Sequence, residues 1–193
     1  MDVLVTRYIG IYGTAILAKE HKDELSQRYP EWFVTEATRF MDGINPDVEL
    51  PEISIANNFG AVYAAEYREF GIFEALYCMS RALNTGLRIS IKDIPIKQET
   101  VEVCECLGVN PYALYAGYSS VIVCENGEAL CALLEENDIP VRIVGCTASD
   151  NDKKIINEDE EGFLPHIRKD ELKNKLGRRV YYERTDFSHL RKE

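Results

Sequence analysis

The 193-residue sequence lacks any long run of apolar residues. Nowhere do about 18 of them follow one another, the length that a membrane-spanning helix needs, so no membrane association is expected. The N-terminus carries Asp2 and has no apolar stretch behind a basic region. A secretory signal is therefore not predicted, and we expect a cytoplasmic location.

Basic residues are also in short supply. Lys and Arg together number 22 against 33 Asp and Glu, which gives a formal net charge of -11. A field of this sign repels a nucleic-acid backbone unless a local basic patch offsets it. The richest basic stretch, 173–179, lies among acidic residues and is typical of a solvated helix face. We expect no nucleic-acid partner.

Residues for metal or hydrolytic chemistry are few. The chain has three histidines and six cysteines, and no histidine lies near a cysteine in sequence. Cys104 and Cys106 are two apart in a predicted helix, so their side chains point about 200° apart and do not share a metal. We interpret the cysteines as small buried apolar residues and predict no metal site.

No catalytic residue is identified. There is no Gly-x-Ser-x-Gly elbow, and no Cys or Ser lies in a context typical of a catalytic triad. Glu135 and Glu136 are neighbours on a predicted helix and point apart, so they do not form a catalytic carboxylate pair.

What is present indicates a folded α+β protein. Hydrophobic residues make up 46% of the chain, and helical and strand periodicities alternate along it. Thr14 is expected to cap the first helix and Gly86 to follow the clearest one. The expected helices are 14–28, one starting at Pro30, 72–83, 98–107, 127–137 and 169–176. The expected strands are 3–5, 60–66, 87–92, 119–124, 141–145, 180–182 and an edge strand at 153–157.

This order predicts a mixed sheet with packed helices and, at its centre, a partial ferredoxin-like topology. The stretch 47–58 is polar, is bounded by two prolines and is expected to be a loop. The acidic run 158–161 is expected to be a solvated turn. We divide the chain into a domain over 1–172 and a charged C-terminal extension over 173–193.

Three stretches carry a resemblance to a known superfamily. They are VLVTRYIGIYGTAIL at 3–17, the stretch 71–114 and IPVRIVGCTASD at 139–150. In order and spacing they resemble the C-terminal domain shared by aminoimidazole ribonucleotide synthetase (PurM-like), selenophosphate synthetase and hydrogenase-maturation proteins. The resemblance implies that a separate N-terminal half supplies the aspartates for Mg²⁺ and ATP. We therefore expect no cofactor for this chain unless a partner half completes it.

The sequence departs from that superfamily where phosphate is bound. Family members carry a segment similar to His-Asp-Val-Thr-Glu-Gly-Gly at a helix N-terminus, and here 65–71 reads AEYREFG. A second segment, similar to Ser-Ser-Gly-Ser, reads AGYS at 116–119. By resemblance, the candidate anion- or ligand-binding residues are Gly10, Gly13, Thr14, Arg68, Gly71, Gly117 and Ser119.

Three aromatic residues replace small or polar family residues: Tyr67, Phe70 and Tyr118. They are a candidate interface, to be covered by a second copy of the chain, a partner protein or the chain's own tail from Phe163 onward. The alternative is that they turn inward and fill the core.

These observations favour a non-catalytic protein that binds a ligand or partner and lacks the ATP-binding half. The alternative is one half of a split ATP-dependent synthetase or maturation enzyme, completed by an N-terminal-type chain. A domain of a longer protein is a third reading. The expected partners are a second copy, giving a homodimer, or an N-terminal-type protein.

Overall fold

The computed structural model describes residues 1–44 and 48–177. Seven strands form one sheet in the order β2-β4-β1-β5-β3-β6-β7, antiparallel except where β6 runs parallel to β3. The strands are β1 Asp2–Thr6, β2 Tyr63–Glu66, β3 Gly86–Ser90, β4 Ser120–Cys124, β5 Val141–Ala148, β6 Lys153–Asn157 and β7 Glu160–Phe163. The helices are α1 Ile11–Glu20, α2 Lys22–Ser26, α3 Glu31–Thr38, α4 Pro51–Phe59, α5 Gly71–Leu83, α6 Gln98–Leu107, α7 Gly127–Glu135 and α8 Glu171–Leu176.

Both faces of the central strands are covered. Because alternate side chains of a strand point to opposite faces, Val3 and Val5 pack with α5 on one face. Leu4, between them, packs with residues of α4 and α7 on the other. This explains why 3–6 of β1 and all of β4 are buried, with no exposed residue in alternation.

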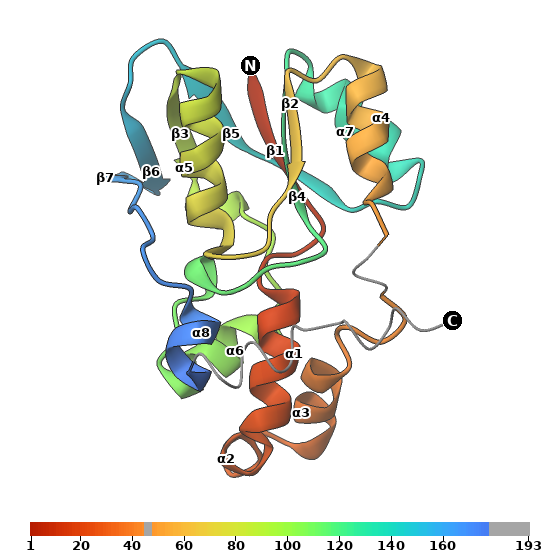
Figure 1. The fold of residues 1–193 in the computed structure, drawn as a ribbon, viewed down its shortest axis with the longest axis vertical. Coiled ribbons are helices and arrows are strands. Elements are labelled where there is room, and N and C mark those ends of the chain that lie inside the picture. Colours follow the sequence, from red (N-terminus) through yellow and green to blue (C-terminus); the bar gives the residue numbers. More distant parts are fainter. Residues whose placement is uncertain (45–47, 178–193) are drawn as a thin grey trace.

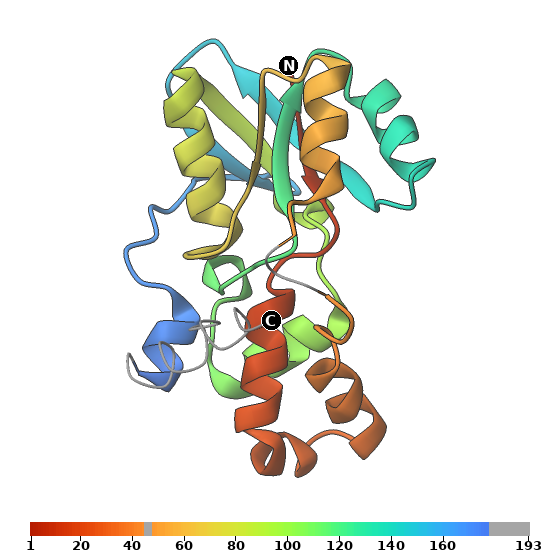
Figure 2. The same cartoon turned by 45° about the vertical axis from the view of Figure 1, so that its right-hand side comes forward.

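A group of helices lies at one end of the sheet. In Figures 1 and 2, α1, α2, α3, α6 and α8 form this helical lobe, and β1 leads directly from the sheet into α1. Leu17, Leu25 and Leu172 belong to its separate apolar cluster. The turns that join the sheet to the helical lobe therefore gather at one level of the molecule.

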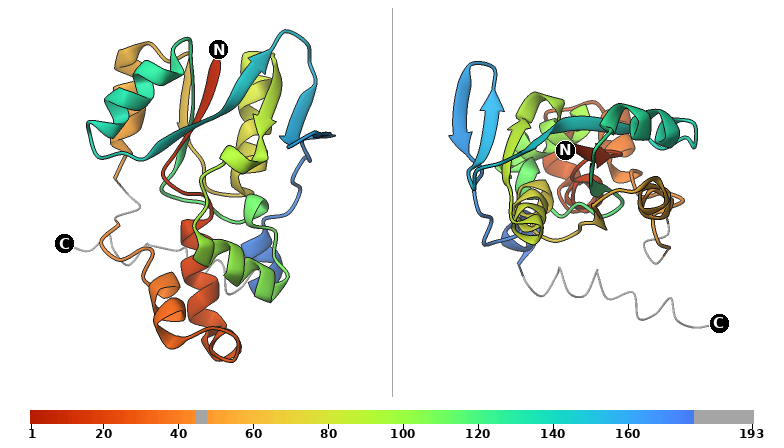
Figure 3. Two further views of the ribbon diagram at one scale, coloured as in Figure 1. Left: turned by 180° about the vertical axis from the view of Figure 1, so that it is seen from behind. Right: turned by 90° about the horizontal axis from the view of Figure 1, so that it is seen from above.

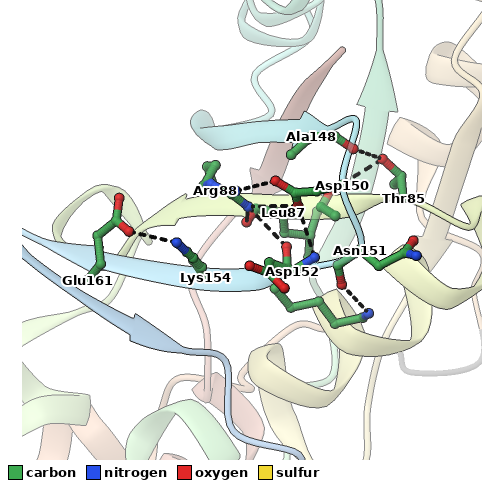
Figure 4. Close-up of polar contacts among 11 residues, drawn as sticks. Thr85, Leu87, Arg88, Ala148, Asp150, Asn151, Asp152, Lys154 and Glu161 are labelled. Atoms are coloured by element: carbon green, nitrogen blue, oxygen red, sulfur yellow. Dashed lines mark hydrogen bonds and ion pairs between the residues drawn. The ribbon is translucent and has the colours of Figure 1, made fainter.

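The β6–β7 hairpin stands at the edge of the sheet away from α4 and α7 (Figure 3). Arg88 of β3 holds the loop before it, since its guanidinium donates to the Asp150 carboxylate at 2.5 Å and to the Asp152 carbonyl at 3.0 Å. Thr85 donates from its hydroxyl to the Ala148 carbonyl at 2.6 Å (Figure 4). These contacts turn the chain back so that β6 runs parallel to β3.

The structure corrects several local predictions. The first helix begins at Ile11 with Gly10 at its cap, so Thr14 lies inside the helix instead of capping it. It ends at Glu20, and a short second helix follows. The expected loop is wrong over 51–58, because Pro51 is well suited to the first position of a helix and α4 starts there.

Further corrections concern turns and cysteines. Asn84, with φ 50°, ends α5, and Gly86 instead begins β3. The edge strand is β7, built partly from the acidic run, and β6 lies between β3 and β7. Cys78 and Cys146 are exposed, against the expectation that all cysteines are buried. The expected strand 180–182 lies outside the described residues.

The two proposed domain ranges meet inside a helix. α8 spans residue 173, and the Lys175 ammonium donates to the Leu107 carbonyl at 2.7 Å. The boundary itself stays a prediction. Within the described ranges, no helix combines the length and the apolar character needed to cross a membrane.

Candidate functional site

The segments that carry the candidate residues lie side by side at the junction of sheet and helical lobe. The N–H groups of Tyr12 and Gly13 donate to the carbonyls of Ala116 and Tyr115, each at 3.1 Å. The Ala116 N–H donates in turn to the Arg68 carbonyl at 2.8 Å. Residues distant in sequence, from the β1–α1 turn, the 66–71 segment and the 115–119 segment, thus form one continuous region.

The residues of the β1–α1 turn contact other residues of the same chain. Gly10 has φ 67°, a conformation that favours glycine, and it starts α1. The buried Thr14 hydroxyl donates to the Gly10 carbonyl at 2.7 Å and lies 3.0 Å from the Thr100 hydroxyl oxygen. At Gly13 an added Cβ would lie 2.5 Å from Leu114, so this glycine permits close packing. These three candidates serve local structure here.

Arg68 already has an acidic partner. Its Nε lies 3.1 Å from a carboxylate oxygen of Glu66, and this hydrogen bond raises the pKa of Arg68. Tyr115 also interacts with the guanidinium. A bound phosphate would have to compete with the Glu66 carboxylate for this side chain.

The N-terminus of α5 is occupied by a carboxylate of the same chain. The Phe70 N–H donates to Asp170 Oδ2 at 2.7 Å, while Asp170 Oδ1 accepts from the N–H groups of Leu172 and Lys173. Asp170 is 1% exposed, and burial raises its pKa. One side chain thus caps α8 and closes the position where the resemblance implies phosphate.

Two further contacts hold this closure. The Lys173 ammonium lies 2.9 Å from a Glu69 carboxylate oxygen and 5.8 Å from the centre of the Phe70 ring.

Gly71 has φ 68°, and an added Cβ would lie 2.4 Å from the Tyr112 carbonyl oxygen. Glycine is therefore required at position 71 by the approach of the backbone of 112–113.

Aromatic rings fill the space between the candidate segments. The ring centres of Tyr12 and Tyr115 are 5.0 Å apart, and Gly117, with φ 58°, packs against Tyr12. The cavity left here, bordered also by Arg68 and Tyr118, has a volume of about 20 Å³. A cavity of roughly 10–15 Å³ by this measure holds one water molecule, so this one is too small for a phosphate group.

The three candidate interface aromatics differ in burial. Tyr67 is 8% exposed and belongs to the core, as the alternative reading expects for it. Phe70 and Tyr118 are half-buried, and the segment 170–173 contacts Phe70. Whether the remaining exposed area of Phe70 and Tyr118 meets another molecule stays a prediction.

Ser119 lies beneath this region next to Tyr67. Burial raises the pKa of Tyr67, and the Ser119 hydroxyl lowers it in part. Neither hydroxyl makes a hydrogen bond of good geometry within the described part of the chain. Ser119 is therefore a buried polar neighbour of Tyr67 and is not open to the surface.

Sequence reasoning missed a buried polar network beside these segments. Glu52 is 0% exposed, and Arg7 meets it in two parallel contacts, Nε to Oε1 at 2.9 Å and Nη2 to Oε2 at 3.0 Å. The Thr6 hydroxyl donates to Glu52 Oε1 at 3.0 Å and lies 2.8 Å from the Ser120 hydroxyl. Arg7 Nη1 donates to the Tyr118 hydroxyl at 2.9 Å.

Arg7 also borders two clefts that share Tyr8 and Pro140 as lining residues. The larger has a volume of about 930 Å³ and runs along β5 and α7. The smaller, of about 310 Å³, lies toward α3 and α6. The lining of the smaller cleft comes from five separate segments of the chain, so no local sequence pattern indicated it. Among the residues described, no cluster of His, Cys, Asp and Glu is suited to hold a metal.

Comparison with known proteins places the fold. The hydrogenase maturation protein HypE of E. coli is 19% identical with a TM-score of 0.68, over 88% of this chain and 50% of that chain. A chain of a HypE–HypF complex is 16% identical with a TM-score of 0.64, over 85% of this chain and 52% of that chain. Thiamine-monophosphate kinase from Stenotrophomonas maltophilia is 16% identical with a TM-score of 0.55, over 82% of this chain and 50% of that chain.

No family model matches the chain, and no curated protein sequence matches it. At the identities found, the likeness shows the fold alone. The expected α+β, PurM-like fold is confirmed, with its mixed sheet and packed helices. The chain spans about half the length of the solved structures that it resembles.

Proposed function

We propose that this chain is a non-catalytic relative of the C-terminal domain of PurM-like proteins, working in the cytoplasm by binding a ligand or a partner protein. The observation that carries the proposal is the Asp170 carboxylate at the N-terminus of α5. A helix N-terminus attracts anions, and here the anion belongs to the protein.

Electrostatics around this helix end oppose nucleotide binding. A triphosphate would meet Asp170, Glu66 and Glu69 in a chain whose net charge is -11. A helix N-terminus contributes about 0.3–1 kcal/mol toward an anion, whereas micromolar affinity requires about 8 kcal/mol. The aromatic filling beside Arg68 removes the remaining space. We therefore expect no tight binding of Mg-ATP by this chain alone.

A protein partner is the second part of the proposal. HypE is found in complex with HypF, so a protein with this fold does form protein assemblies. Phe70 and Tyr118 are half-buried at the region where the candidate segments meet. We propose that this region contacts either a second copy of the chain, as a homodimer, or an N-terminal-type protein.

The alternative is one half of an ATP-dependent synthetase or maturation enzyme. Its support is that the chain spans about half of the structures it resembles. In that case ATP and Mg²⁺ would bind only after completion by the other half, and the Asp170 contact would have to open.

The test combines calorimetry and light scattering. Titration with Mg-ATP should give no binding at or below about the micromolar range, and tight binding would refute the non-catalytic reading. The Phe70→Asp, Tyr118→Asp double variant should lose association while staying folded. Trp32→Asp is the matched control, since Trp32 is 69% exposed on α3. Unchanged association with a collapsed melting temperature would show that the aromatics belong to the core.

A further inference from the structure

The smaller cleft beside Arg7 has the composition of a ligand pocket. Its volume is about 310 Å³, at the lower end of the roughly 300–1,000 Å³ of small-molecule sites. Its lining combines three aromatic rings with three cationic side chains: Tyr8, Phe40, Tyr118, Arg7, Arg39 and Lys97. Glu36 is its single acidic lining residue among those described.

This cationic lining is unusual for the chain, because the protein as a whole carries a net charge of -11. Two of the three cations have acidic partners, since Arg7 pairs with Glu52 and Arg39 with Asp42. Lys97 makes no ion pair within residues 1–44 and 48–177. Among the described residues its ammonium faces aromatic rings, with no carboxylate paired to it.

The aromatic rings surround that charge. The Lys97 ammonium lies 5.1 Å from the centre of the Tyr8 ring and 5.2 Å from that of Phe40. Tyr8 is 37% exposed, and Phe40 and Lys97 are half-buried. A flat ring entering between such walls would find stacking surfaces beside an ammonium group.

The side chains of Arg7 and Tyr118, which form one side of the pocket, are held in place by contacts within the protein. The guanidinium carbon of Arg7 lies 4.1 Å from the centre of the Tyr118 ring, and Nη1 also bonds its hydroxyl. Both residues have positive φ, 58° for Arg7 and 64° for Tyr118. Such backbone conformations are strained for side-chain-bearing residues and cluster at functional sites, where the surroundings hold them. Here the fully buried Glu52 provides the anchor.

We propose that this pocket binds a small, single-ring aromatic anion, an aryl carboxylate or aryl phosphate, with the ring among Tyr8, Phe40 and Tyr118 and the anionic group at Lys97. The site goes beyond the proposed function. No residue of 66–71 lines it, and it shares only Tyr118 with the candidate interface.

The experiment titrates the full 193-residue chain with four probes by calorimetry at low ionic strength. Phenyl phosphate and benzoate carry both features of the ligand, inorganic phosphate carries only the charge, and benzyl alcohol carries only the ring. We expect at least one of the first two to bind, and to bind at least about tenfold more tightly than either single-feature probe. Which of the two binds identifies the anionic group.

Lys97→Met keeps the apolar stem and removes the charge, and should weaken binding about tenfold or more. Tyr8→Ala, at a more exposed position, should also weaken it and serves as a second variant if Lys97→Met does not fold. Lys22→Met is the matched control, because Lys22 is an exposed residue of α2 outside the cleft lining. It should bind as the wild type does.

Three results would overturn the site: no binding of either aromatic anion, equal binding of inorganic phosphate, or Lys97 and Tyr8 variants that bind as the wild type. Tight Mg-ATP binding that is insensitive to Lys97→Met would instead count against the proposed function. The two proposals can therefore fail separately.

Discussion

The pair formed by Arg7 and Glu52 allows a sharp test of the energetics beside the clefts. Glu52 is 0% exposed, and the Arg7 side chain is 14% exposed. Replacing Arg7 by Met leaves a fully buried carboxylate without its cation, which should cost about 3–5 kcal/mol of folding free energy at neutral pH. Glu52→Gln keeps the shape and leaves an arginine that reaches cleft water, so it should cost about 1–3 kcal/mol.

The two effects should not add. Once Arg7 is gone, Glu52→Gln removes the unpaired charge, so the double variant should lose about 1–3 kcal/mol less than the sum of the single losses. Urea denaturation of the four proteins at pH about 7 measures this coupling.

The matched control is Arg39→Met, which breaks the exposed pair with Asp42, 65% and 59% exposed, and should change stability by less than about 0.5 kcal/mol. Additivity of the Arg7 and Glu52 variants within about 0.5 kcal/mol would contradict a tightly coupled buried pair.

Three further predictions concern single residues. Burial raises the pKa of Asp170, so its folded-state pKa lies above the unfolded value of about 3.9. The stability that Asp170 contributes is present below that value and is lost as the pH rises through the folded pKa. The free energy of unfolding of Asp170→Asn minus that of the wild type, measured by urea denaturation, should therefore increase from about pH 4 to about pH 7. A difference that does not change with pH would contradict this. Gly71→Ala should destabilise the protein by about 2–4 kcal/mol, because φ 68° is strained for alanine and the Cβ would lie 2.4 Å from a carbonyl oxygen; a thermal melt within about 1 °C of the wild type would refute it. Thr14→Val should cost about 1–2 kcal/mol, since the Gly10 carbonyl and the Thr100 hydroxyl lose a buried partner, and denaturant titration checks the value.

The elements with strong periodicity were predictable from the sequence. The apolar spacing in 72–83 and the alternation in 87–92 indicated α5 and β3, and both are present with ends shifted by one or two residues. α4 was not predictable in this way, because Pro51 and two asparagines in 51–59 resemble a loop, whereas the helix is held by packing of Ala56 against the sheet.

The candidate site was predictable only in outline. The resemblance indicated which segments come together, and their backbone bonds show that they do. The Asp170 contact with Phe70 joins residues 100 apart, and the Arg7 pair with Glu52 joins residues 45 apart, so no local pattern marks either of them. The predicted helix 169–176 included Asp170 at its second position, where an Asp is a signal for a cap one residue later, but its hydrogen bond to Phe70 depends on tertiary structure.

The position of β1 sets the order in which the molecule is completed during synthesis. β1 lies inside the sheet and pairs with β4 and β5, which end at Cys124 and Ala148. β1 therefore waits for more than a hundred further residues to be synthesised before either of its neighbours exists. Partners so distant in sequence make folding slow, and the apolar Val3-Leu4-Val5 stretch stays exposed meanwhile. A nascent chain stopped before β4 should bind chaperones that recognise short apolar strands, and one that extends past β5 should release them.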